Sequence, residues 1–299
     1  MCIVNIANNH DMSMEEARQK MIELYDKNVH GKFPDTSAIT ESFDGKVGRW
    51  LEVQLGVKPN AANEPDIYGI EVKTDTKSAL TLGSWDPNYW IFLDEEYGIT
   101  RDDFMKIFGH ERPPPEGIID KIIRIFRKEY SWSGKPVPRY FNGGLSNKFG
   151  VRIEIDGSNN ISFVYSYTDD KRHKKSSIVP KDLQDADFTI ARWDADYDES
   201  RYNAPNMKKG LRRKVEDKYS INGWCRCFRS TQENGELGAY SSIGFMDPMT
   251  FETFMGHFKT GDFYFDCGMH QSEKGNTRNY CQWRVRNRFL DSLIVSRHP

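Results

Sequence analysis

Two carboxylates and a lysine lie close together in the segment NEPDIYGIEVKTDT, residues 63–76. Asp66 precedes a Tyr-Gly pair, and Glu71 and Lys73 follow that pair. Alternate side chains of a strand point to the same face, so Glu71 and Lys73 share one face while the apolar residues between them point into the core. A turn at Tyr68–Gly69 would bring Asp66 beside them by hairpin pairing. The pattern therefore predicts a compact polar site at the end of an apolar hairpin.

These residue types suit phosphate chemistry at a divalent cation. Two carboxylates fit Mg²⁺, which prefers oxygen ligands and usually retains several waters. A lysine adds a charge that can hold an attacking water or stabilise charge on a phosphate. Glu52 offers a further carboxylate for the same metal cluster or a second metal, because Leu51 and Leu55 could pack its segment against the hairpin. The D-x₄-E-x-K string also arises by chance, and a solvated hairpin with alternating charges is the alternative.

Two helices are expected before this hairpin. Residues 14–27 carry apolar side chains at helical spacing, with Ser13 as the N-cap and Glu16 completing a capping box. Residues 48–55 predict a second, shorter helix that ends at Gly56. The hairpin thus follows a helix that carries a glutamate.

The rest of the chain alternates between strand and helix patterns. Residues 117–130 predict an amphipathic helix, and residues 151–170 predict a β-hairpin. An acidic run at 182–200 is followed by a basic run at 208–214, and this shift in composition predicts an exposed connection. Residues 261–295 predict a strand, a polar loop and a second strand.

Composition places the chain among ordinary globular proteins. It has 299 residues, of which 29% are charged and 37% hydrophobic, with a net charge of −2 and a pI near 6.4. Whole-chain charge does not predict nucleic-acid binding, so that function must rest on local basic clusters. We expect no signal peptide and no membrane span, because no apolar run reaches the ~18 residues that a bilayer requires. Five cysteines are a low and odd count, typical of reduced thiols in a cytoplasm.

The cysteines leave a zinc site as an alternative. Cys225 and Cys227, together with Cys267, His270 and Cys281, offer enough ligands for a tetrahedral site. The C-x-C spacing is less typical of zinc than C-x₂₋₄-C, and no second matching pair follows. The metal-site prediction therefore stays with the carboxylates.

One longer segment carries a family resemblance. GKVGRWLEVQLGVKPNAANEPDIYGIEVKTDTKSALTL resembles the catalytic segment of the MvaI/BcnI family of type II restriction endonucleases, which is related to the mismatch-repair nuclease MutH within the PD-(D/E)XK superfamily. That pattern has a helix with a glutamate, an N-x-x-x-PD turn, a glycine, E-x-K, and a Thr before a Ser/Thr-Leu-rich strand. Here the matching positions are Glu52, Asn60 or Asn63, Pro65, Asp66, Gly69, Glu71, Lys73 and Thr74. The match is dense over this segment and looser elsewhere.

The resemblance implies a role for each residue of the site. Asp66 and Glu71 would bind a divalent metal, Mg²⁺ with Mn²⁺ able to substitute, and the backbone carbonyl of Val72 would complete the site. Lys73 would position or activate the water, and Glu52 would be the accessory acid. The implied reaction is the hydrolysis of a DNA phosphodiester that leaves a 5′-phosphate.

The C-terminal stretch FDCGMHQSEKGNTRNYCQWRVRN resembles the part of this family that approaches the major groove. Arginine can make bidentate hydrogen bonds to guanine, an aspartate can accept from cytosine, and a neutral histidine can both donate and accept. The predicted DNA-binding residues are Asp266, His270, Lys274, Arg278, Arg284 and Arg286. Asp266 stands where the family can carry an arginine, which leaves the target sequence open. For His270, an ordinary loop histidine is the alternative.

Together these observations predict an α/β protein with a PD-(D/E)XK nuclease core, a mixed sheet flanked by helices. A second lobe would recognise DNA, with a cleft between the two. We expect residues 1–155 to form mainly the catalytic lobe and residues 156–299 mainly the recognition lobe, interleaved in sequence.

The predicted function is that of a Mg²⁺-dependent type II restriction endonuclease. It would cut double-stranded DNA at a short GC-containing target, as a monomer in a bacterial or archaeal cytoplasm, with a cognate DNA methyltransferase as the other component of the system. Two alternatives stay open: a MutH-like strand-nicking repair enzyme, and a DNA-binding protein with an inactive site. The intact Asp66, Glu71 and Lys73 argue against the second, and the match to the MvaI/BcnI pattern favours restriction over the first.

Overall fold

The computed structural model divides the chain into two compact units, each built from separate segments. Unit 1 comprises Met1–Leu80, Arg213–Thr253 and Arg286–Pro299, and unit 2 comprises Thr81–Arg212 and Phe254–Val285. The structure describes residues 12–37, 39, 45–57, 63–77, 79–111, 127–132, 140, 144–197, 209–272 and 277–299. For 127–129, 270–272, 277 and 278 it describes the backbone alone. Residue 155, the predicted boundary, lies within unit 2.

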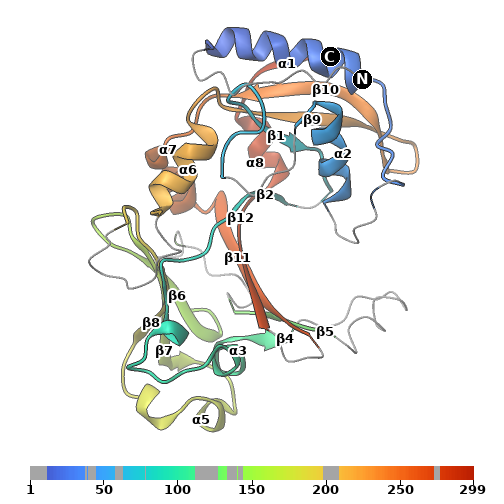
Figure 1. Cartoon of the computed structure of the whole chain (residues 1–299). Coiled ribbons are helices and arrows are strands. Elements are labelled where there is room, and N and C mark those ends of the chain that lie inside the picture. The colour runs from blue at the N-terminus through green and yellow to red at the C-terminus, as the bar shows by residue number, and fades with distance from the viewer. Residues whose placement is uncertain are drawn as a thin grey trace. The chain divides into compact units, whose positions relative to one another are not determined.

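The described residues form both helices and strands, a mixed α/β fold as predicted (Figure 1). The helices are α1 (Met14–Asn28), α2 (Lys46–Gln54), α3 (Arg101–Phe108), α5 (Lys175–Ile178), α6 (Leu211–Tyr219), α7 (Phe251–Thr260) and α8 (Asn287–Ser292), with 3₁₀ turns η1 (Ile91–Leu93) and η3 (Lys181–Leu183). The strands are β1 (Glu71–Thr74), β2 (Leu80–Ser84), β3 (Tyr89–Trp90), β4 (His110–Glu111), β5 (Arg127–Ser131), β6 (Phe149–Ile155), β7 (Ile161–Asp170), β8 (Phe188–Trp193), β9 (Trp224–Thr231), β10 (Leu237–Met246), β11 (Phe263–Ser272), β12 (Thr277–Val285) and β13 (Ile294–His298). No helix within these ranges is long and apolar enough to cross a bilayer.

Unit 2 contains two sheets around an aromatic core. One sheet has the order β3-β8-β7-β6 and the other β2-β12-β11-β5-β4. Trp193 and Phe265, one from each sheet, pack edge to face with ring centroids 4.5 Å apart, and Trp283 packs 5.1 Å from Phe265. Such aromatic pairs add to the stabilisation from burial alone. The two predicted hairpins are confirmed as the antiparallel pairs β6–β7 and β11–β12.

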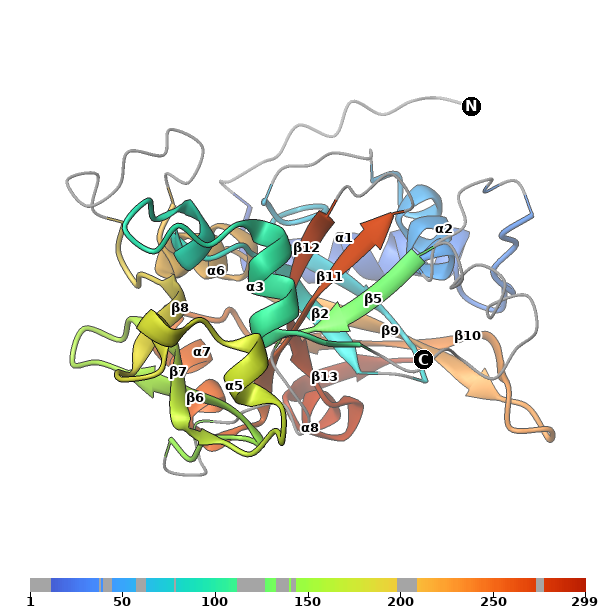
Figure 2. The same cartoon turned by 90° about the horizontal axis from the view of Figure 1, so that it is seen from below.

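The helix predicted at 117–130 is wrong where the structure describes it. Residues 127–131 form β5, which pairs antiparallel with β11 and lies on the opposite side of β11 from β12 (Figure 2). The rest of the predicted helix lies outside the described residues. The backbone hydrogen bonds of this segment go to β11, which is distant in the sequence, so helical periodicity cannot reveal them. Here tertiary pairing overrides the local pattern.

The exposed connection predicted at the shift from acidic to basic residues lies outside the described residues, but most of the acidic run before it is described. Residues 188–193 form β8, whose apolar side chains are buried while the aspartates flank the strand. Asp194, directly after it, is buried and pairs with Arg192 through an Nε–Oδ1 distance of 3.0 Å. Residues 198–208 lie outside the described residues. The acidic composition of residues 182–200 therefore did not indicate the buried strand β8 within them.

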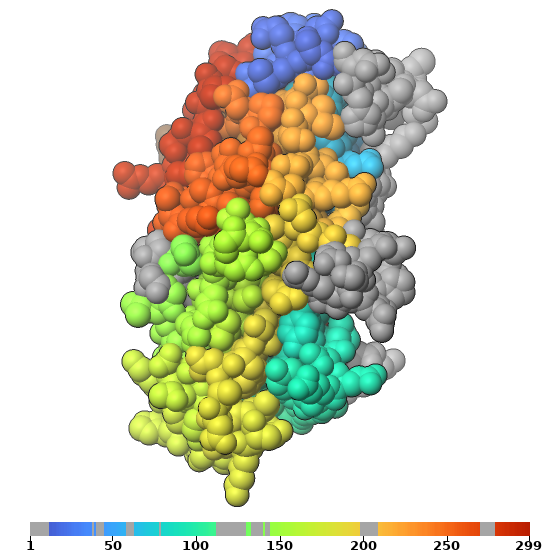
Figure 3. Space-filling view, turned by 90° about the vertical axis from the view of Figure 1, so that its left-hand side faces the viewer, coloured from blue at the N-terminus to red at the C-terminus, as the bar shows by residue number. Residues whose placement is uncertain are grey.

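Helix α1 confirms the predicted start signal. The Ser13 hydroxyl accepts from the Glu16 amide at 3.3 Å, and the Glu16 carboxylate accepts from the Ser13 amide at 3.2 Å, which completes the capping box. The helix lies beside the last strand of the chain on the surface of unit 1, the blue and red regions at the top of Figure 3. His298 of β13 bonds to Asp26 of α1 with an Nε2–Oδ1 distance of 3.0 Å.

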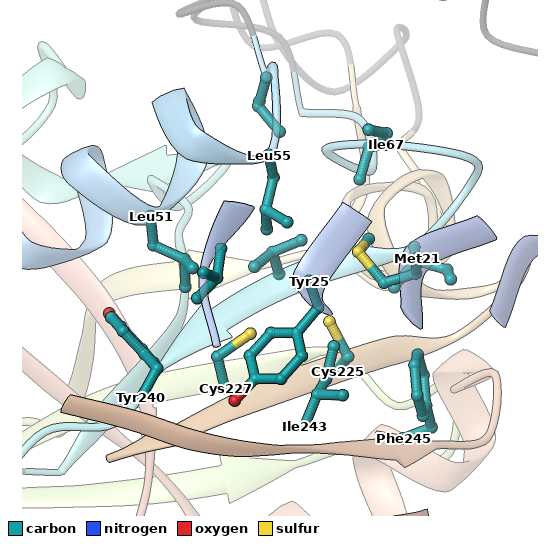
Figure 4. Close-up of a cluster of buried hydrophobic side chains, with 14 of the residues drawn as sticks. Met21, Tyr25, Leu51, Leu55, Ile67, Cys225, Cys227, Tyr240, Ile243 and Phe245 are labelled. Atoms are coloured by element: carbon teal, nitrogen blue, oxygen red, sulfur yellow. The ribbon is translucent and has the colours of Figure 1, made fainter. Parts of the chain in front are cut away.

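Unit 1 has a four-stranded sheet in the order β1-β9-β10-β13. β1 runs parallel to β9, whereas β9–β10 and β10–β13 are antiparallel. Helices α1 and α2 pack on one face of this sheet, where a cluster of buried side chains lies between helices and strands (Figure 4). The helices contribute Ala17, Met21, Tyr25, Leu51 and Leu55, and the strands contribute Val72, Cys225, Cys227, Tyr240, Ile243 and Phe245. Since Val72 points into this core, the alternate residues Glu71 and Lys73 point to the opposite face.

Candidate active site

The predicted Tyr68–Gly69 turn is present, but only its second arm continues as a strand. Ile67 and Ile70 form an isolated antiparallel bridge around the turn. Tyr68 and Gly69 have φ angles of 52° and 74°, the left-handed conformation that two-residue hairpin turns of type I′ require. Residues 63–66 form no strand, so the longer hairpin pairing expected for Asp66 is wrong.

Asp66 is positioned by local hydrogen bonds. Its amide donates to the Ile70 carbonyl at 3.1 Å, and its Oδ2 accepts from the Val72 amide at 2.8 Å. The carboxylate thus bridges the turn and reaches the start of β1. This places it beside Glu71, as the sequence predicted, by a shorter route than strand pairing.

The connection between α6 and β9 holds the turn from the other side. The Asn222 amide donates to the Gly69 carbonyl at 3.0 Å, and the Asn222 side chain donates to the Tyr68 carbonyl at 2.7 Å. The Glu71 amide donates to the Gly223 carbonyl at 3.1 Å. Because β1 and β9 are parallel, the segment that enters β9 lies beside the turn that enters β1. No local pattern in the sequence indicates this contact.

Replacing Gly69 with alanine should destabilise this turn. A Cβ at Gly69 would lie 2.6 Å from the Ile221 side chain, and φ is +74°. We expect Gly69→Ala to lower the free energy of unfolding by about 1–3 kcal/mol, from backbone strain and overpacking together. Gly31→Ala is the matched control, since Gly31 has φ +73° and no heavy atom within 4 Å of its Cβ position. Urea unfolding of the two variants measures the difference, and equal losses would contradict the packing argument.

Glu71 is the centre of a charged cluster on the face of β1 away from α1 and α2. Its side chain is 3% exposed, and its Oε1 accepts from the Lys73 amine at 2.7 Å. A second lysine, Lys218 of α6, lies on the same oxygen at 2.9 Å. Lys218 is not among the predicted site residues, because nothing local in the sequence links residue 218 to residue 71. The pairing of β1 with β9 brings the end of α6 to this site.

The other carboxylate of the site, Asp66, has a raised pKa. Burial first, and the neighbouring charge of Glu71 second, raise the pKa of Asp66 from 3.8 to about 7. The Val72 amide and the lysines Lys73 and Lys218 act in the opposite direction. A strongly raised carboxylate pKa beside a second carboxylate is typical of functional sites.

The oxygens of this cluster fit a hard divalent cation. Oε2 of Glu71 is buried and has no hydrogen-bond partner among the described residues. A buried carboxylate oxygen without a donor is costly unless a cation compensates it. Mg²⁺ is commonly held by one or two carboxylates together with waters and substrate phosphates, which agrees with Asp66 and Glu71 as the pair. In the described part of the chain, no group of three or more His, Cys, Asp or Glu residues is close enough to hold a metal.

The third predicted acid, Glu52, lies on α2, which packs beside β1 through Leu51 as expected. Its Oε2 lies 3.4 Å from Nη1 of Arg49, one turn earlier in the helix. Hydrogen bonds and ion pairs of the described residues connect Asp66 with Val72 and connect Glu71 with the two lysines, but they give Glu52 a different partner. An accessory role for Glu52 stays a prediction.

The cysteines lie in hydrophobic cores. Cys225 and Cys227 share the core face of β9 in unit 1, while Cys267 and Cys281 are opposite each other in the β11–β12 pair of unit 2. All four are buried and free. A hydrogen bond with Cys227, together with burial, raises the pKa of the Cys225 thiol, which favours the neutral thiol over the thiolate that zinc requires. The His270 side chain of the zinc alternative lies outside the described residues.

The predicted DNA-binding residues are described only in part. Asp266 of β11 and Arg284 of β12 form an ion pair with an Nε–Oδ2 distance of 3.0 Å. Arg286 is exposed and directly precedes α8. Lys274 and the side chains of His270 and Arg278 lie outside the described residues.

The mixed α/β fold of this chain is that of a known restriction endonuclease. A solved structure of the restriction endonuclease MvaI with its cognate DNA substrate has this fold, with a TM-score of 0.53, 14% identity, and coverage of 96% of this chain and 99% of that one. A family model described as LlaMI restriction endonuclease matches residues 30–297. The type II restriction enzyme ScrFI of Lactococcus lactis subsp. cremoris is 34% identical over 295 residues, which are 95% of this chain and 100% of that protein. The chain belongs to the LlaMI restriction endonuclease family and is thus an enzyme of the type II restriction class.

Proposed function

We propose that this enzyme hydrolyses double-stranded DNA at a short GC-containing target in a Mg²⁺-dependent reaction that leaves 5′-phosphates. The observation that carries the proposal is the cluster of Asp66, Glu71 and Lys73, in which Glu71 is buried and one of its carboxylate oxygens has no partner among the described residues. ScrFI is named as a type II restriction enzyme, and the MvaI structure contains DNA, which supports DNA as the substrate.

Each residue then has a distinct task. Asp66 and Glu71, with the carbonyl of Val72, would hold the metal, which when bound supplies positive charge to the scissile phosphate and lowers the pKa of a water. The Lys73 amine lies on the same face of β1 as the Glu71 carboxylate and would orient the attacking water. The Val72 amide keeps the Asp66 carboxylate aimed at the site through their 2.8 Å hydrogen bond. Glu52 would assist from α2.

Target recognition is assigned to unit 2 and the adjoining Arg286. Asp266 and Arg284 lie on neighbouring strands, and a paired aspartate fixes the guanidinium for bidentate contact with a guanine. We propose His270, Lys274 and Arg278, which lie between Asp266 and Arg284 in the sequence, as further DNA contacts. Unit 1 would then cut while unit 2 selects the site.

The partners proposed follow from this function. A type II enzyme endangers its own genome unless a cognate DNA methyltransferase protects the target, so we propose such a methyltransferase as the second component of the system. We propose that the nuclease acts as a monomer with one active site, cutting the two strands in succession. Nicked plasmid should then appear before linear plasmid.

Plasmid cleavage with sequencing of the ends tests the proposal. We expect discrete fragments whose ends share one short motif and carry 5′-phosphates, formed with Mg²⁺ or Mn²⁺ and absent with EDTA. Nicks without double-strand breaks would indicate the MutH-like alternative. Absence of cleavage on DNA from several unmethylated sources, with DNA binding retained, would indicate an inactive binding protein.

The raised pKa of Asp66 predicts that metal binding depends on pH. A metal needs the carboxylate form, so binding releases the proton, and with a pKa of about 7 the affinity for Mn²⁺ should be about tenfold weaker at pH 6 than at pH 8. The effect on metal-free stability has the opposite sign. The folded state binds this proton more tightly than the unfolded state, so the contribution of Asp66 is complete below pH 3.8 and is lost as the pH rises through 7. Mn²⁺ titrations at both pH values check the first effect, and an affinity independent of pH would contradict it.

A further inference from the structure

We propose that Lys218 is a positioning residue of the nuclease site, which holds Glu71 so that Lys73 can serve the attacking water. The proposal rests on the proposed function, in which Asp66, Glu71 and Lys73 form the hydrolytic site. It adds to that site a residue from a helix about 150 positions away in the sequence.

The geometry gives Glu71 two cations on one oxygen. The amines of Lys73 and Lys218 lie 2.7 and 2.9 Å from Oε1, while Oε2 has no partner among the described residues. A buried carboxylate that loses its sole cation is strongly destabilised. With two lysines, one can leave Oε1 and the other still compensates the charge. Lys73 can therefore turn to a water without leaving Glu71 buried and unpaired.

The two lysines differ in how their backbones are held. Lys73 is two residues from Glu71 on the same short strand. Lys218 lies in the last turn of α6, next to Tyr219, which is buried, packs edge to face on Trp224 at 5.2 Å and accepts at its carbonyl from the Met249 amide at 3.1 Å. The following residues bond to the Tyr68–Gly69 turn, as described above. The backbone that carries Lys218 is thus fastened to the hairpin that carries both carboxylates.

A role for Lys218 at the end of helix α6 alone explains less of this arrangement. A lysine in the last turn of a helix is favourable near the carbonyl end of the helix dipole. That role needs no approach to a carboxylate, and an exposed side chain would fulfil it. The Lys218 side chain is instead 17% exposed and ends on Glu71, which is 3% exposed. The contact between Lys218 and Glu71 therefore indicates a role in the nuclease site rather than at the end of the helix.

Four variants test this inference: Lys218→Met, Lys218→Arg, Lys73→Met and Arg213→Met. Arg213 lies on the same helix, is exposed, and forms a long ion pair of 3.7 Å with Asp217. Its variant therefore controls for the loss of a cation from α6. We expect Lys218→Met to lower kcat about 100-fold with KM for DNA within about threefold, because it removes an interaction needed in the transition state. Arginine keeps the charge at position 218 and should restore kcat to within about tenfold of wild type. Arg213→Met should change kcat less than about twofold.

The second measurement is the affinity of the metal-free protein for Mn²⁺, monitored by electron paramagnetic resonance of the free ion. For Lys218→Met we expect a dissociation constant within about threefold of wild type, since Lys73 still compensates Glu71 when no substrate is present. Wild-type kcat, a loss of Mn²⁺ affinity above about tenfold, or no rescue by arginine would overturn the inference. If the methionine variant does not fold, Lys218→Gln is judged by the same criteria. Lys73→Met separates the two proposals: if it cleaves normally the proposed function fails, whereas if it is inactive and Lys218→Met is fully active only this inference fails.

Discussion

Asp66→Asn is expected to lower DNA cleavage by roughly 1,000-fold or more while leaving the protein folded, because it removes the charge of a proposed metal ligand but keeps the shape of the side chain. The asparagine carbonyl can still accept the 2.8 Å hydrogen bond from the Val72 amide, so the turn should keep its geometry. At pH 8 the metal-free variant should be at least as stable as wild type, because a buried carboxylate charge has been replaced by a neutral amide. Single-turnover cleavage and urea unfolding measure the two effects.

The control and the DNA-binding measurement make this result specific. Asp35→Asn removes an exposed carboxylate of unit 1 and should leave cleavage unchanged. DNA binding by Asp66→Asn without metal should stay within about threefold of wild type, since the proposed DNA contacts lie on other residues. The stabilisation of wild type by Mn²⁺ on thermal unfolding should disappear in the variant. Full cleavage by Asp66→Asn would contradict the site assignment outright.

Arg226→Met is expected to cause a large loss of stability. Arg226 is 3% exposed on β9, and its guanidinium pairs with Asp75, which directly follows β1, and at 2.6 Å with Asp291 of α8. Removing the arginine would leave Asp75, 12% exposed, without its cation. Breaking a buried ion pair in this way typically costs about 3–5 kcal/mol. Urea unfolding should show a loss of that order.

A double-mutant cycle separates the ion pair from simple packing. Arg226→Met combined with Asp75→Asn should be destabilised by less than the sum of the two single changes, by about 1–3 kcal/mol, because no buried charge is left unpaired. Arg213→Met, which affects an exposed pair on α6, should change stability by no more than about 1 kcal/mol. Strict additivity in the cycle would show that Arg226 contributes through packing alone.

Several features of this protein could be predicted from the sequence because they depend on neighbours along the chain. The capping box of Ser13 and Glu16, the left-handed turn at Tyr68–Gly69, and the opposite orientation of Glu71 and Val72 each follow from backbone geometry over a few residues. The residue types of the E-x-K motif likewise indicated the chemistry, and family membership agrees with that interpretation.

Other features depended on which distant segments pair. The parallel pairing of β1 with β9 brings Lys218 to Glu71 and Asn222 to the turn, and the pairing of residues 127–131 with β11 makes a strand of a segment with helical periodicity. Periodicity and spacing carry no information about such partners, because the free energy that selects them comes from burying whole faces of the sheet and satisfying backbone groups across them. The sequence by itself determined the Tyr68–Gly69 turn and the two acids and the lysine around it. The tertiary structure alone decided how deeply Asp66 is buried, and hence its pKa, and that a second lysine meets Glu71.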